Sequence, residues 1–490
     1  MEIAKASLKE LTKAIKDKKI SCEELTRHYL NEIGKQNSKI NAYISLNEQA
    51  IDQAKELDLQ ISKHNLSDKK LLGIPFGIKD MICTKGLKTT AASKMLENFV
   101  PPYDATLVER IKNHGGIILG KLNQDEFAMG SSNENSYFGP CKNPWDLERV
   151  PGGSSGGSAA AQAAGLAAIT IGTDTGGSIR QPSNFCNTVG VKPTYGRISR
   201  YGVVAFASSL DQAGPIASCT EDAALALEAI CGVDEKDSTT AIEKVENFSE
   251  NLAKDLKGLK IGIIKEFHAD KIATSVQKVY QEALSNAKNL GAEIVEISIP
   301  MTQQSIPMYY LIAASEASSN LARYDGVRYG YRSEFPDLSG IELEKFYSRT
   351  RAEGFGAEVQ RRIILGTYCL SSGYFDAYYK KACQVRRILK NQFNEEFKKC
   401  DVILSPVTTS PAFKLTEKIN DPLSMYLNDI YTVSANLVGL PGMSLPYGFS
   451  ENHLPIGVQL MAPAFQEKKM LNVAHALEQT TAATRKKAVL

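Results

Sequence analysis

The sequence has little net charge and no long apolar run. Its 57 Lys and Arg residues nearly balance 55 Asp and Glu residues, which leaves a formal charge of +2. This balance does not predict a broad basic surface for nucleic acid or an anionic membrane. No uninterrupted apolar run reaches about 18 residues, the length that a membrane-spanning helix needs. We therefore expect no membrane span.

Paired cysteines and a secretory leader are also missing. The nine cysteines are odd in number and scattered, and none forms a C-x-x-C pair. This distribution predicts neither disulfides nor a zinc cluster, and we expect no metal in this chain. The opening MEIAKASLKELTKAIKDKK reads as a charged amphipathic helix without the apolar core of a signal peptide. A cytoplasmic location fits these features.

Helical and strand-like segments divide the chain into regions. Ser7 with Glu10 and Ser21 with Glu24 match the capping box that starts a helix, so residues 1–65 are predicted to be a helical segment. From about residue 71, the short apolar runs LLGIPFGI, GGIILGKL and LAAITIGT alternate with helical stretches. This alternation predicts an α/β fold, with helices on both faces of a sheet.

Strand-like runs on both sides of a helical block predict one large domain over residues 1–490. The catalytic core is placed at 71–235, and a polar connection follows at 236–258. Residues 304–400 read as mostly helical. DVILSPV, GMSLPYGF and PIGVQLMAP then resume the strand pattern. Residues 304–400 are therefore interpreted as a helical insertion on the substrate side.

The stretch PGGSSGGS at 151–158 suggests two familiar loops but fits neither. A phosphate-binding P-loop needs a lysine where Ser158 stands, which argues against a nucleotide-binding protein. The G-x-S-x-G pattern around Ser154 is convincing only after a strand, and the preceding NPWDLERV is a poor strand. A nucleotide-binding or non-catalytic scaffold protein remains the remote alternative.

A better-placed serine lies 24 residues further on. Ser178 follows the apolar run LAAITIGT in the turn DTGGSIRQP, so it comes just after a strand end. The backbone amides of Thr175, Gly176, Gly177 and Ser178 can converge there on one point, as in an oxyanion hole. We therefore predict that Ser178 is a nucleophile.

A nucleophilic serine needs a base, and histidine is a poor candidate here. The six histidines all fall in charged helices or polar loops. Lys79 ends the apolar run LLGIPFGIK, which would carry its amine into a dry interior. Burial would have to lower its pKa from about 10.4 towards about 7 for it to act as the base. The competing interpretation is a lysine at a strand end beside Asp80.

The chain resembles the amidase signature family in three features, which are Lys79, the GGSSGGS loop and TDTGGSIRQP. The fold of this family is built on a large mixed β-sheet. The matching stretch runs from PGGSSGGS to TYGRIS. The resemblance implies that Ser178 is the acyl-forming nucleophile and Lys79 the base. It also implies that Ser154, held by a cis peptide bond, relays the proton between them. The glycines would let the backbone fold tightly around Ser154, with the free amides of the following helix facing the site.

The chain is also similar to family members that act as glutaminase subunits of tRNA-dependent amidotransferases. This similarity lies in further stretches, including GIPFGIKD, RYDGVRYGYR and NDIYTVSANLVGLPGMSLP. The resemblance implies that this chain hydrolyses glutamine. Ammonia would then pass through a tunnel to a partner subunit, which amidates tRNA-linked glutamate. It further implies that Arg362 binds the α-carboxylate of glutamine and Asp429 its α-ammonium, with Gly130, Ser131 and Tyr309 lining the pocket. Sequence physics alone does not choose Arg362 and Tyr309 over their neighbours Arg361 and Tyr310.

The same resemblance implies two partner subunits, one a kinase and transamidase and one a small linker. ATP and Mg²⁺ are expected in the partner, with no cofactor in this chain. Because its charge is balanced, tRNA contact is expected mainly through the partner. The main alternative is a stand-alone amidase that hydrolyses small amides. The sequence does not decide whether the acceptor is glutamate or aspartate on tRNA.

Overall fold

The computed structural model describes residues 2–3, 6–63, 66, 68–267, 272–335, 342–418 and 421–488. Within these ranges eleven strands form one sheet, in the order β1-β3-β2-β4-β6-β5-β10-β11-β9-β7-β8. Some neighbours are parallel, such as β2 and β4, and others are antiparallel, such as β4 and β6, so the sheet is mixed. The strands are β1 (Tyr43–Leu46), β2 (Pro75–Lys79), β3 (Ile117–Leu122), β4 (Ile169–Asp174), β5 (Val189–Lys192), β6 (Gln212–Ala217), β7 (Lys260–Ile264), β8 (Glu293–Ile297), β9 (Val402–Pro406), β10 (Gly442–Phe449) and β11 (Pro455–Met461).

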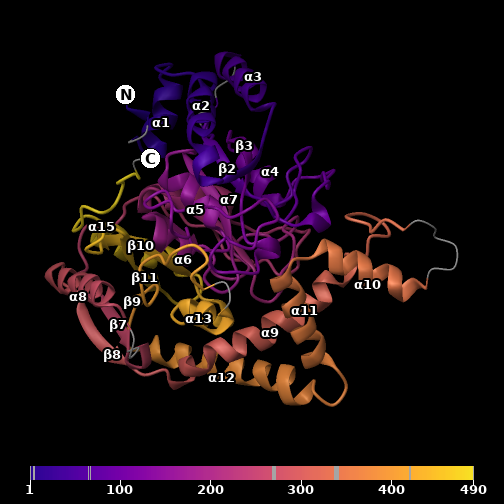
Figure 1. The fold of residues 1–490 in the computed structure, drawn as a ribbon. Coiled ribbons are helices and arrows are strands. Elements are labelled where there is room, and N and C mark those ends of the chain that lie inside the picture. Colours follow the sequence, from indigo (N-terminus) through magenta and orange to yellow (C-terminus); the bar gives the residue numbers. More distant parts are fainter. Residues whose placement is uncertain are drawn as a thin grey trace.

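Helices surround this sheet, and both chain ends lie on the same side of the molecule (Figure 1). None of the described helices is long and apolar enough to cross a membrane. The helices are α1 (Leu8–Lys16), α2 (Cys22–Ile40), α3 (Ala50–Lys63), α4 (Thr106–Asn113), α5 (Gly156–Ala163), α6 (Arg180–Cys186), α7 (Thr220–Ile230), α8 (Thr274–Asn289), α9 (Ser305–Asn320), α10 (Leu343–Gly354), α11 (Ala357–Leu370), α12 (Lys381–Glu396), α13 (Pro422–Tyr426), α14 (Val433–Val438) and α15 (Glu467–Glu478).

Helices cover both faces of the sheet, as the alternating pattern predicted. Ile216 of β6 packs in one apolar cluster with Ala159 of α5 and with Ile179, which precedes α6. The next residue, Ala217, belongs instead to the main core together with residues of α7 such as Ala223. Successive side chains of a strand point to opposite faces, so α5 and α7 lie on opposite sides of β6. The α/β class of the fold is therefore confirmed.

Both predicted capping boxes are present in the N-terminal segment. Ser7 Oγ accepts the amide of Glu10, whose carboxylate accepts the amide of Ser7, and the same exchange links Ser21 and Glu24. Describing residues 1–65 as helical was incomplete, however. Residues Tyr43–Leu46 form β1, which pairs antiparallel with β3 at the edge of the sheet. The segment therefore contributes to the sheet itself.

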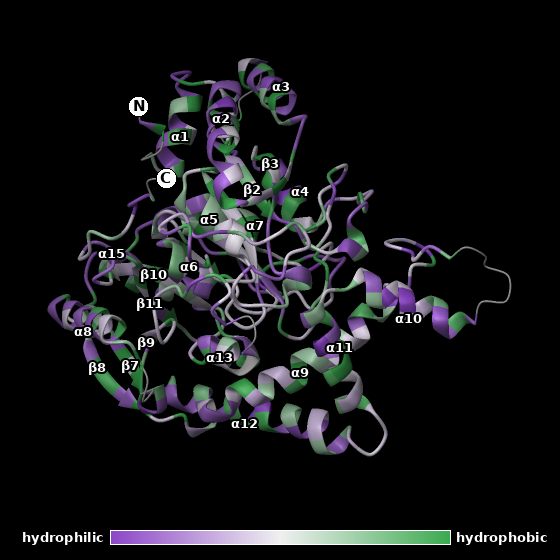
Figure 2. Cartoon of the chain, in the orientation of Figure 1, coloured by the Kyte–Doolittle hydropathy of each residue, from purple (hydrophilic) through white to green (hydrophobic). Residues whose placement is uncertain are grey.

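Four α-helices make up most of the described part of block 304–400, and residues 336–341 lie outside the described part of the chain. Helix α9 packs against α11 and α12, whereas α10 projects away from the body (Figure 1). Figure 2 shows hydrophilic residues along α10 and α12 and hydrophobic residues at the strands and at α5 and α7. Strands from before and after this block lie in the same sheet.

The order of the strands brings the predicted triad segments together. β2 and β4 are parallel neighbours, so their carboxyl ends meet at one edge of the sheet. Lys79 is the last residue of β2, and the turn that carries Ser178 directly follows β4. Helix α5, which begins next to Ser154, packs on both strands. The sequence thus places all three side chains at the same edge.

Candidate active site

Lys79 is fully buried, with an exposed fraction of 0%. Its Nζ donates to Ser154 Oγ at 2.7 Å and to Ser155 Oγ at 2.9 Å, and it lies 3.4 Å from the carbonyl oxygen of Thr173. The amine therefore faces two hydroxyl groups. Hydroxyl groups can both accept and donate a proton, so this contact suits a base.

Burial lowers the pKa of Lys79 from its ordinary value of 10.5 to about 7. The loss of solvation disfavours the charged ammonium, and this outweighs the opposing attraction of Asp125, Asp174 and Asp211. A neutral amine is consequently present near neutral pH. The shift has the size that a lysine base needs.

The loop before α5 wraps closely around Ser154. The Gly153-Ser154 peptide bond is cis. The amide of Gly153 donates to Oε1 of Gln181 at 2.9 Å. A Cβ atom on Gly153 would lie 2.1 Å from Asp125 Oδ2, so only glycine fits at this position. The glycines thus allow the tight path that the sequence predicted.

The amides of the following helix are not all free, which corrects one expectation. The Gly157 amide, in the first turn of α5, donates to Asn133 Oδ1 at 2.9 Å and to the carbonyl oxygen of Asn123 at 3.1 Å. Both acceptors come from the segment after β3. The amide therefore fixes α5 in place and cannot serve a ligand.

Ser178 lies in the turn after β4 and is about 8% exposed. The amide of Ser155 donates to its carbonyl oxygen at 3.1 Å, which ties this turn to the Ser154 loop. One of the four proposed oxyanion amides is already engaged, because Gly177 donates to Asp174 Oδ1 at 2.8 Å. The amides of Thr175, Gly176 and Ser178 make no hydrogen bond within the described ranges. We therefore restrict the proposed oxyanion hole to these three amides.

A buried ion pair supports this turn, and the sequence analysis missed it. Arg180 Nε lies 3.0 Å from Asp174 Oδ2, and both side chains are fully buried. Burial alone would raise the pKa of Asp174, but Arg180 outweighs it and lowers that pKa to about 2. Asn436 donates to the same carboxylate, and Thr432 Oγ1 donates to the carbonyl oxygen of Gly176. Asp174 thus stays charged and holds the turn rigid.

The structure distinguishes Arg362 from its neighbour Arg361. Arg362 is buried beside the rings of Phe206 and Tyr310, whereas Arg361 is exposed. Arg362 Nε donates to Glu358 Oε1 at 2.8 Å. Its two Nη nitrogens make no hydrogen bond to any described residue. They are therefore the donors left for a carboxylate ligand.

The other predicted substrate residues surround the same region. Ser131 Oγ donates to Asp429 Oδ2 at 2.6 Å. Burial raises the pKa of Asp429 to about 7, against the opposing effects of Ser131 and Arg362. Tyr309 lies against the oxyanion turn, since a Cβ on Gly176 would be 2.8 Å from its hydroxyl oxygen. Tyr310 instead stacks on Tyr426, with ring centroids 3.8 Å apart. Gly130 approaches Asp125, whose carboxylate leaves no room for a side chain there.

Sequence reasoning missed two further residues next to the triad. Ser155 is a second hydroxyl on the Lys79 amine, and its position directly after Ser154 was the available signal. Asp125 is fully buried, and its carboxylate accepts the amides of Asn133 and Asn135. Burial raises its pKa to about 6. Nothing in the local sequence around Asp125 marks it, because its partners come together only in the folded chain.

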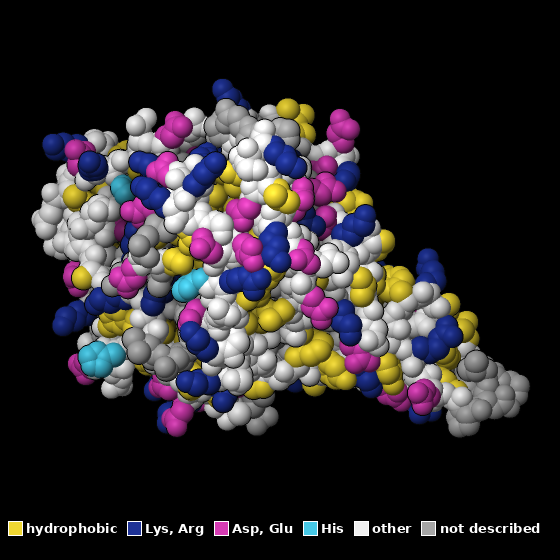
Figure 3. All heavy atoms as spheres, turned by 90° about the horizontal axis from the view of Figure 1, so that it is seen from above, with side chains coloured by type: hydrophobic (Ala, Val, Ile, Leu, Met, Phe, Trp, Pro, Cys, Tyr) yellow, Lys and Arg dark blue, Asp and Glu magenta, His cyan; other side chains and the backbone are white. Residues whose placement is uncertain are grey.

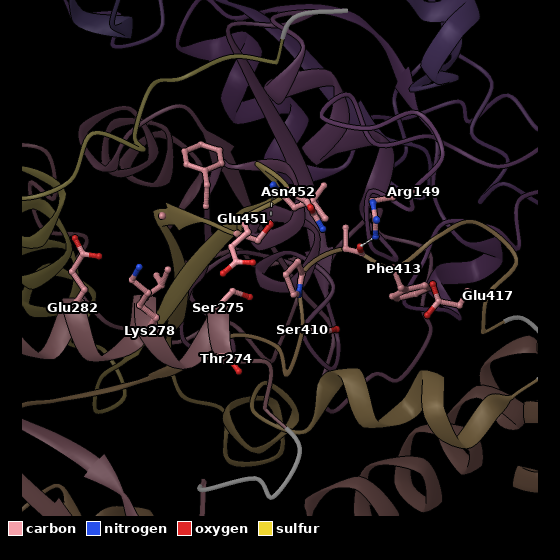
Figure 4. Close-up of a pocket in the computed structure, with 17 residues that line it drawn as sticks. Arg149, Thr274, Ser275, Lys278, Glu282, Ser410, Phe413, Glu417, Glu451 and Asn452 are labelled. Atoms are coloured by element: carbon pink, nitrogen blue, oxygen red, sulfur yellow. Dashed lines mark hydrogen bonds between the residues drawn. The ribbon is translucent and has the colours of Figure 1, made fainter.

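A large hollow elsewhere on the surface contains none of these residues. It has a volume of about 640 Å³ and lies between α8 and the turn that joins β10 to β11 (Figure 4). Its charged residues are of both signs, with Lys278 and Arg149 near Glu282, Glu417 and Glu451. The volume of a cavity therefore does not point to the predicted catalytic residues in this chain.

Metal ligands and histidines do not gather at the site. In the described part of the chain, no group of three or more His, Cys, Asp or Glu side chains could hold a metal ion. His64 and His268 lie outside the described residues. The hydrogen bonds of Lys79 go to hydroxyl and carbonyl oxygens. The Lys79 amine thus contacts the hydroxyls of Ser154 and Ser155.

Residues 24–471 match the Amidase family model, and the chain belongs to this family. Among curated relatives, it is 63% identical to the A subunit of the glutamyl-tRNA(Gln) amidotransferase from Bdellovibrio bacteriovorus, covering 98% of this chain and 97% of the relative. It is 54% identical to the protein of the same name from Carboxydothermus hydrogenoformans, covering 98% of both chains.

Solved structures give the same grouping. The A subunit of the glutamyl-tRNA(Gln) amidotransferase from Thermotoga maritima superposes with a TM-score of 0.81 at 39% identity, covering 100% of this chain and 99% of that one. The peptide amidase of Stenotrophomonas maltophilia superposes with a TM-score of 0.83 at 28% identity, covering 99% of each chain. The fold therefore occurs both in amidotransferase subunits and in an amidase of another substrate class.

Proposed function

We propose that this chain is the glutamine-hydrolysing subunit of a tRNA-dependent amidotransferase. The observation that carries this proposal is the buried Lys79 amine, which is held 2.7 Å from the Ser154 hydroxyl and has a pKa of about 7. High identity to amidotransferase A subunits over nearly the whole chain supports the substrate and the wider reaction. The enzyme class follows from the family, and the roles of individual residues below are our assignment.

The first half of the reaction forms an ester on Ser178. The neutral Lys79 amine takes a proton from Ser154, which takes one from Ser178 as that oxygen attacks the carboxamide carbon of glutamine. The amides of Thr175, Gly176 and Ser178 would hold the oxyanion that forms. The lysine proton then returns through Ser154 to the leaving nitrogen. Ammonia departs, and a glutamyl ester remains on Ser178.

The second half restores the enzyme. A water molecule loses a proton through the same relay and attacks the ester carbon, which releases glutamate and reprotonates Ser178. Because Lys79 must be neutral to start each half, we expect the rate of glutamine hydrolysis to rise as the pH passes through about 7. No cofactor of this chain enters either step.

Two opposite charges select free glutamine. In this proposal the Nη nitrogens of Arg362 bind the α-carboxylate, and the Asp429 carboxylate, fixed by Ser131, binds the α-ammonium. Tyr309, beside Gly176, bounds the pocket near the reacting carbon. Because burial raises the pKa of Asp429, the substrate ammonium would bind best once this carboxyl is deprotonated.

The released ammonia would pass to partner subunits in the cytoplasm. We infer a kinase and transamidase subunit, which binds ATP and Mg²⁺ and amidates Glu-tRNA(Gln), and a small linker subunit. Lys, Arg, Asp and Glu side chains are interspersed on the face of this chain seen in Figure 3. This mixture supports leaving most tRNA contact to the partner.

A glutaminase assay tests the proposal directly. The isolated chain is expected to hydrolyse glutamine and simple amides slowly. Addition of the partner subunits, ATP and Glu-tRNA(Gln) is expected to raise glutamine hydrolysis and yield Gln-tRNA(Gln). Rapid hydrolysis of simple amides by the isolated chain, without a response to the partners, would instead identify a stand-alone amidase.

A further inference from the structure

A second hollow lies along α12, apart from the proposed active site. It has a volume of about 500 Å³, and its wall includes residues of α12 and the segments around Tyr195, Leu437 and Phe465. Neither Lys79 nor either of the triad serines lines it. In Figure 1, α12 lies on the far side of α13 from the sheet. The volume is within the range of small-ligand pockets, about 300 to 1,000 Å³.

The charge of this hollow is of one sign. Arg386, Arg387 and Lys390 line it from a single helix, and we call them the α12 cations. Among the described residues that line it, none is acidic. Glu316, which accepts the amide of Ser209, is close in structure but is not part of the lining. This composition differs from the hollow of Figure 4, where three glutamates accompany the two cations.

Three hydrogen bonds fix the guanidinium of Arg386. Its Nε donates to the carbonyl oxygen of Leu437, its Nη1 donates to Ser209 Oγ at 2.8 Å, and its Nη2 donates to the Ser209 carbonyl oxygen at 3.0 Å. A guanidinium has five N–H donors, so two remain available. A fixed fork with free donors suits a phosphate group.

The other two cations have no partner within the described ranges. Arg387 and Lys390 are exposed, and neither makes a hydrogen bond or an ion pair to a described residue. Like charges one turn apart on a helix repel each other by a few tenths of a kcal/mol. A bound anion would remove this repulsion.

Aromatic rings form another part of the wall. Tyr195 and Phe465 both line the hollow. Phe465 has a φ of +64°, which is uncommon for a bulky residue, and its amide donates to Thr194 Oγ1 at 2.8 Å. Backbone in such conformations is concentrated at ligand sites. Arg200 lies over one face of the Tyr195 ring and Arg197 over one face of the Phe465 ring, so a planar group would stack on the opposite face of either ring.

We propose that this hollow binds a small phosphorylated ligand with a planar ring, of the nucleoside phosphate class. Its phosphates would contact the α12 cations, and its ring would pack on Tyr195 or Phe465. The site is separate from glutamine hydrolysis and does not depend on the function proposed above. ATP binding by a partner subunit is a different event, because this site lies on the isolated chain.

Titration calorimetry on the purified full chain tests this site with ATP, inorganic tripolyphosphate and adenosine as probes. ATP is expected to bind most tightly, tripolyphosphate at least threefold more weakly, and adenosine not measurably. The Arg387→Glu/Lys390→Glu variant should weaken ATP binding at least tenfold. The milder Arg387→Gln/Lys390→Gln variant keeps two exposed polar residues and should weaken it several-fold. Glutamine hydrolysis by both variants should match the parent chain, which shows that they fold.

The matched control is Lys381→Glu/Lys398→Glu. It changes the net charge by the same amount at exposed positions in or beside α12 that do not line the hollow. ATP affinity should change less than twofold. The proposal is overturned if the control weakens ATP as much as the Glu variant does. It is equally overturned if ATP binds both variants as it binds the parent chain, or if tripolyphosphate binds as tightly as ATP.

Discussion

Lys79 and Lys192 occupy equivalent positions in two regions of one sheet. Lys79 is the last residue of β2 and Lys192 the last residue of β5, and each is at most 1% exposed. Burial lowers the pKa of each from 10.5 to about 7. By burial and pKa alone, either amine could be a general base.

Their hydrogen-bond partners differ. Lys192 Nζ donates to the carbonyl oxygens of Pro193 and Leu440, at 2.8 Å and 2.5 Å. A carbonyl oxygen has no proton to give, so a neutral Lys192 can only donate. Lys79 faces the hydroxyls of Ser154 and Ser155, which can give up a proton. Burial therefore lowers the pKa of both amines. Only an amine that contacts a hydroxyl group can then accept a proton from its partner and act as a base.

The largest expected effect comes from removing the Ser178 hydroxyl, the proposed nucleophile of the site that contains Lys79. We expect Ser178→Ala to lower kcat for glutamine by about 10⁴-fold or more, because no ester can form. The control is Ser444→Ala on β10, a buried serine whose hydroxyl has no partner in the described chain. It should keep activity within about threefold. Turnover of Ser178→Ala near the parent rate would rule out this nucleophile.

Exchanging each lysine for methionine tests the comparison itself. Lys79→Met should lower kcat by about 10³-fold, since general-base catalysis contributes about 10² to 10⁴. Lys192→Met removes an amine of similar burial and pKa but should retain at least about a tenth of the activity. Thermal unfolding of both variants checks that each still folds. Equal losses in the two variants would show that partner chemistry does not separate the two lysines.

A smaller effect is expected from the second hydroxyl on Lys79. Ser155→Ala removes one of the two hydroxyl contacts that orient the amine, a hydrogen bond worth about 1 kcal/mol, so kcat should fall about fivefold to tenfold with KM unchanged. Ser158→Ala is the control, because Ser158 lies in α5, which Ser155 directly precedes, and its hydroxyl donates to the main-chain carbonyl oxygen of Ile171 rather than contacting Lys79. A loss confined to KM would assign Ser155 to substrate binding instead.

Much of the fold could be predicted from apolar runs and capping residues. The runs that contain β2, β3 and β4 are long enough to identify strands, and the capping serines gave α1 and α2. Strands β1, β5 and β6 carry weaker sequence patterns, and Gln212–Ala217 even contains Gly and Pro. Strands β5 and β6 form because neighbours on both sides supply hydrogen bonds, as β4 and β5 do for β6. Strand β1 lies at the edge of the described sheet and pairs with β3.

Local sequence patterns could suggest candidate site residues only where these adjoin a strand end. Lys79 and the turn of Ser178 both follow apolar runs, which local sequence can reveal. Asp125 accepts amides only eight and ten residues further on, and Arg180 pairs with Asp174 six residues away, so these contacts depend on how one loop and one turn fold. Arg180 also donates to Thr432 and Asn436, which lie far away in the sequence. The engagement of Gly177 by Asp174 likewise depends on side-chain direction, which no residue pattern encodes.

In one property, the pH dependence of the free energy of unfolding, the two lysines should behave alike. The folded pKa of each is about 7, below the ordinary 10.5, so between these values the unfolded chain binds a proton that the folded chain does not. The free energy of unfolding therefore rises with pH across this window, by on the order of 1 kcal/mol per pH unit for each lysine. Below about pH 7 both states are protonated and this contribution no longer changes.

Lys79→Met and Lys192→Met should each lose that slope. Relative to the parent chain, both variants should be most stable at about pH 7 and lose this advantage towards about pH 9.5. Urea unfolding at the two pH values measures the difference, with the exposed Lys85→Met as the control that shifts equally at both. A slope lost in Lys79→Met but kept in Lys192→Met would mean that the carbonyl partners hold Lys192 charged. The two regions would then already differ in protonation, before any difference in proton transfer.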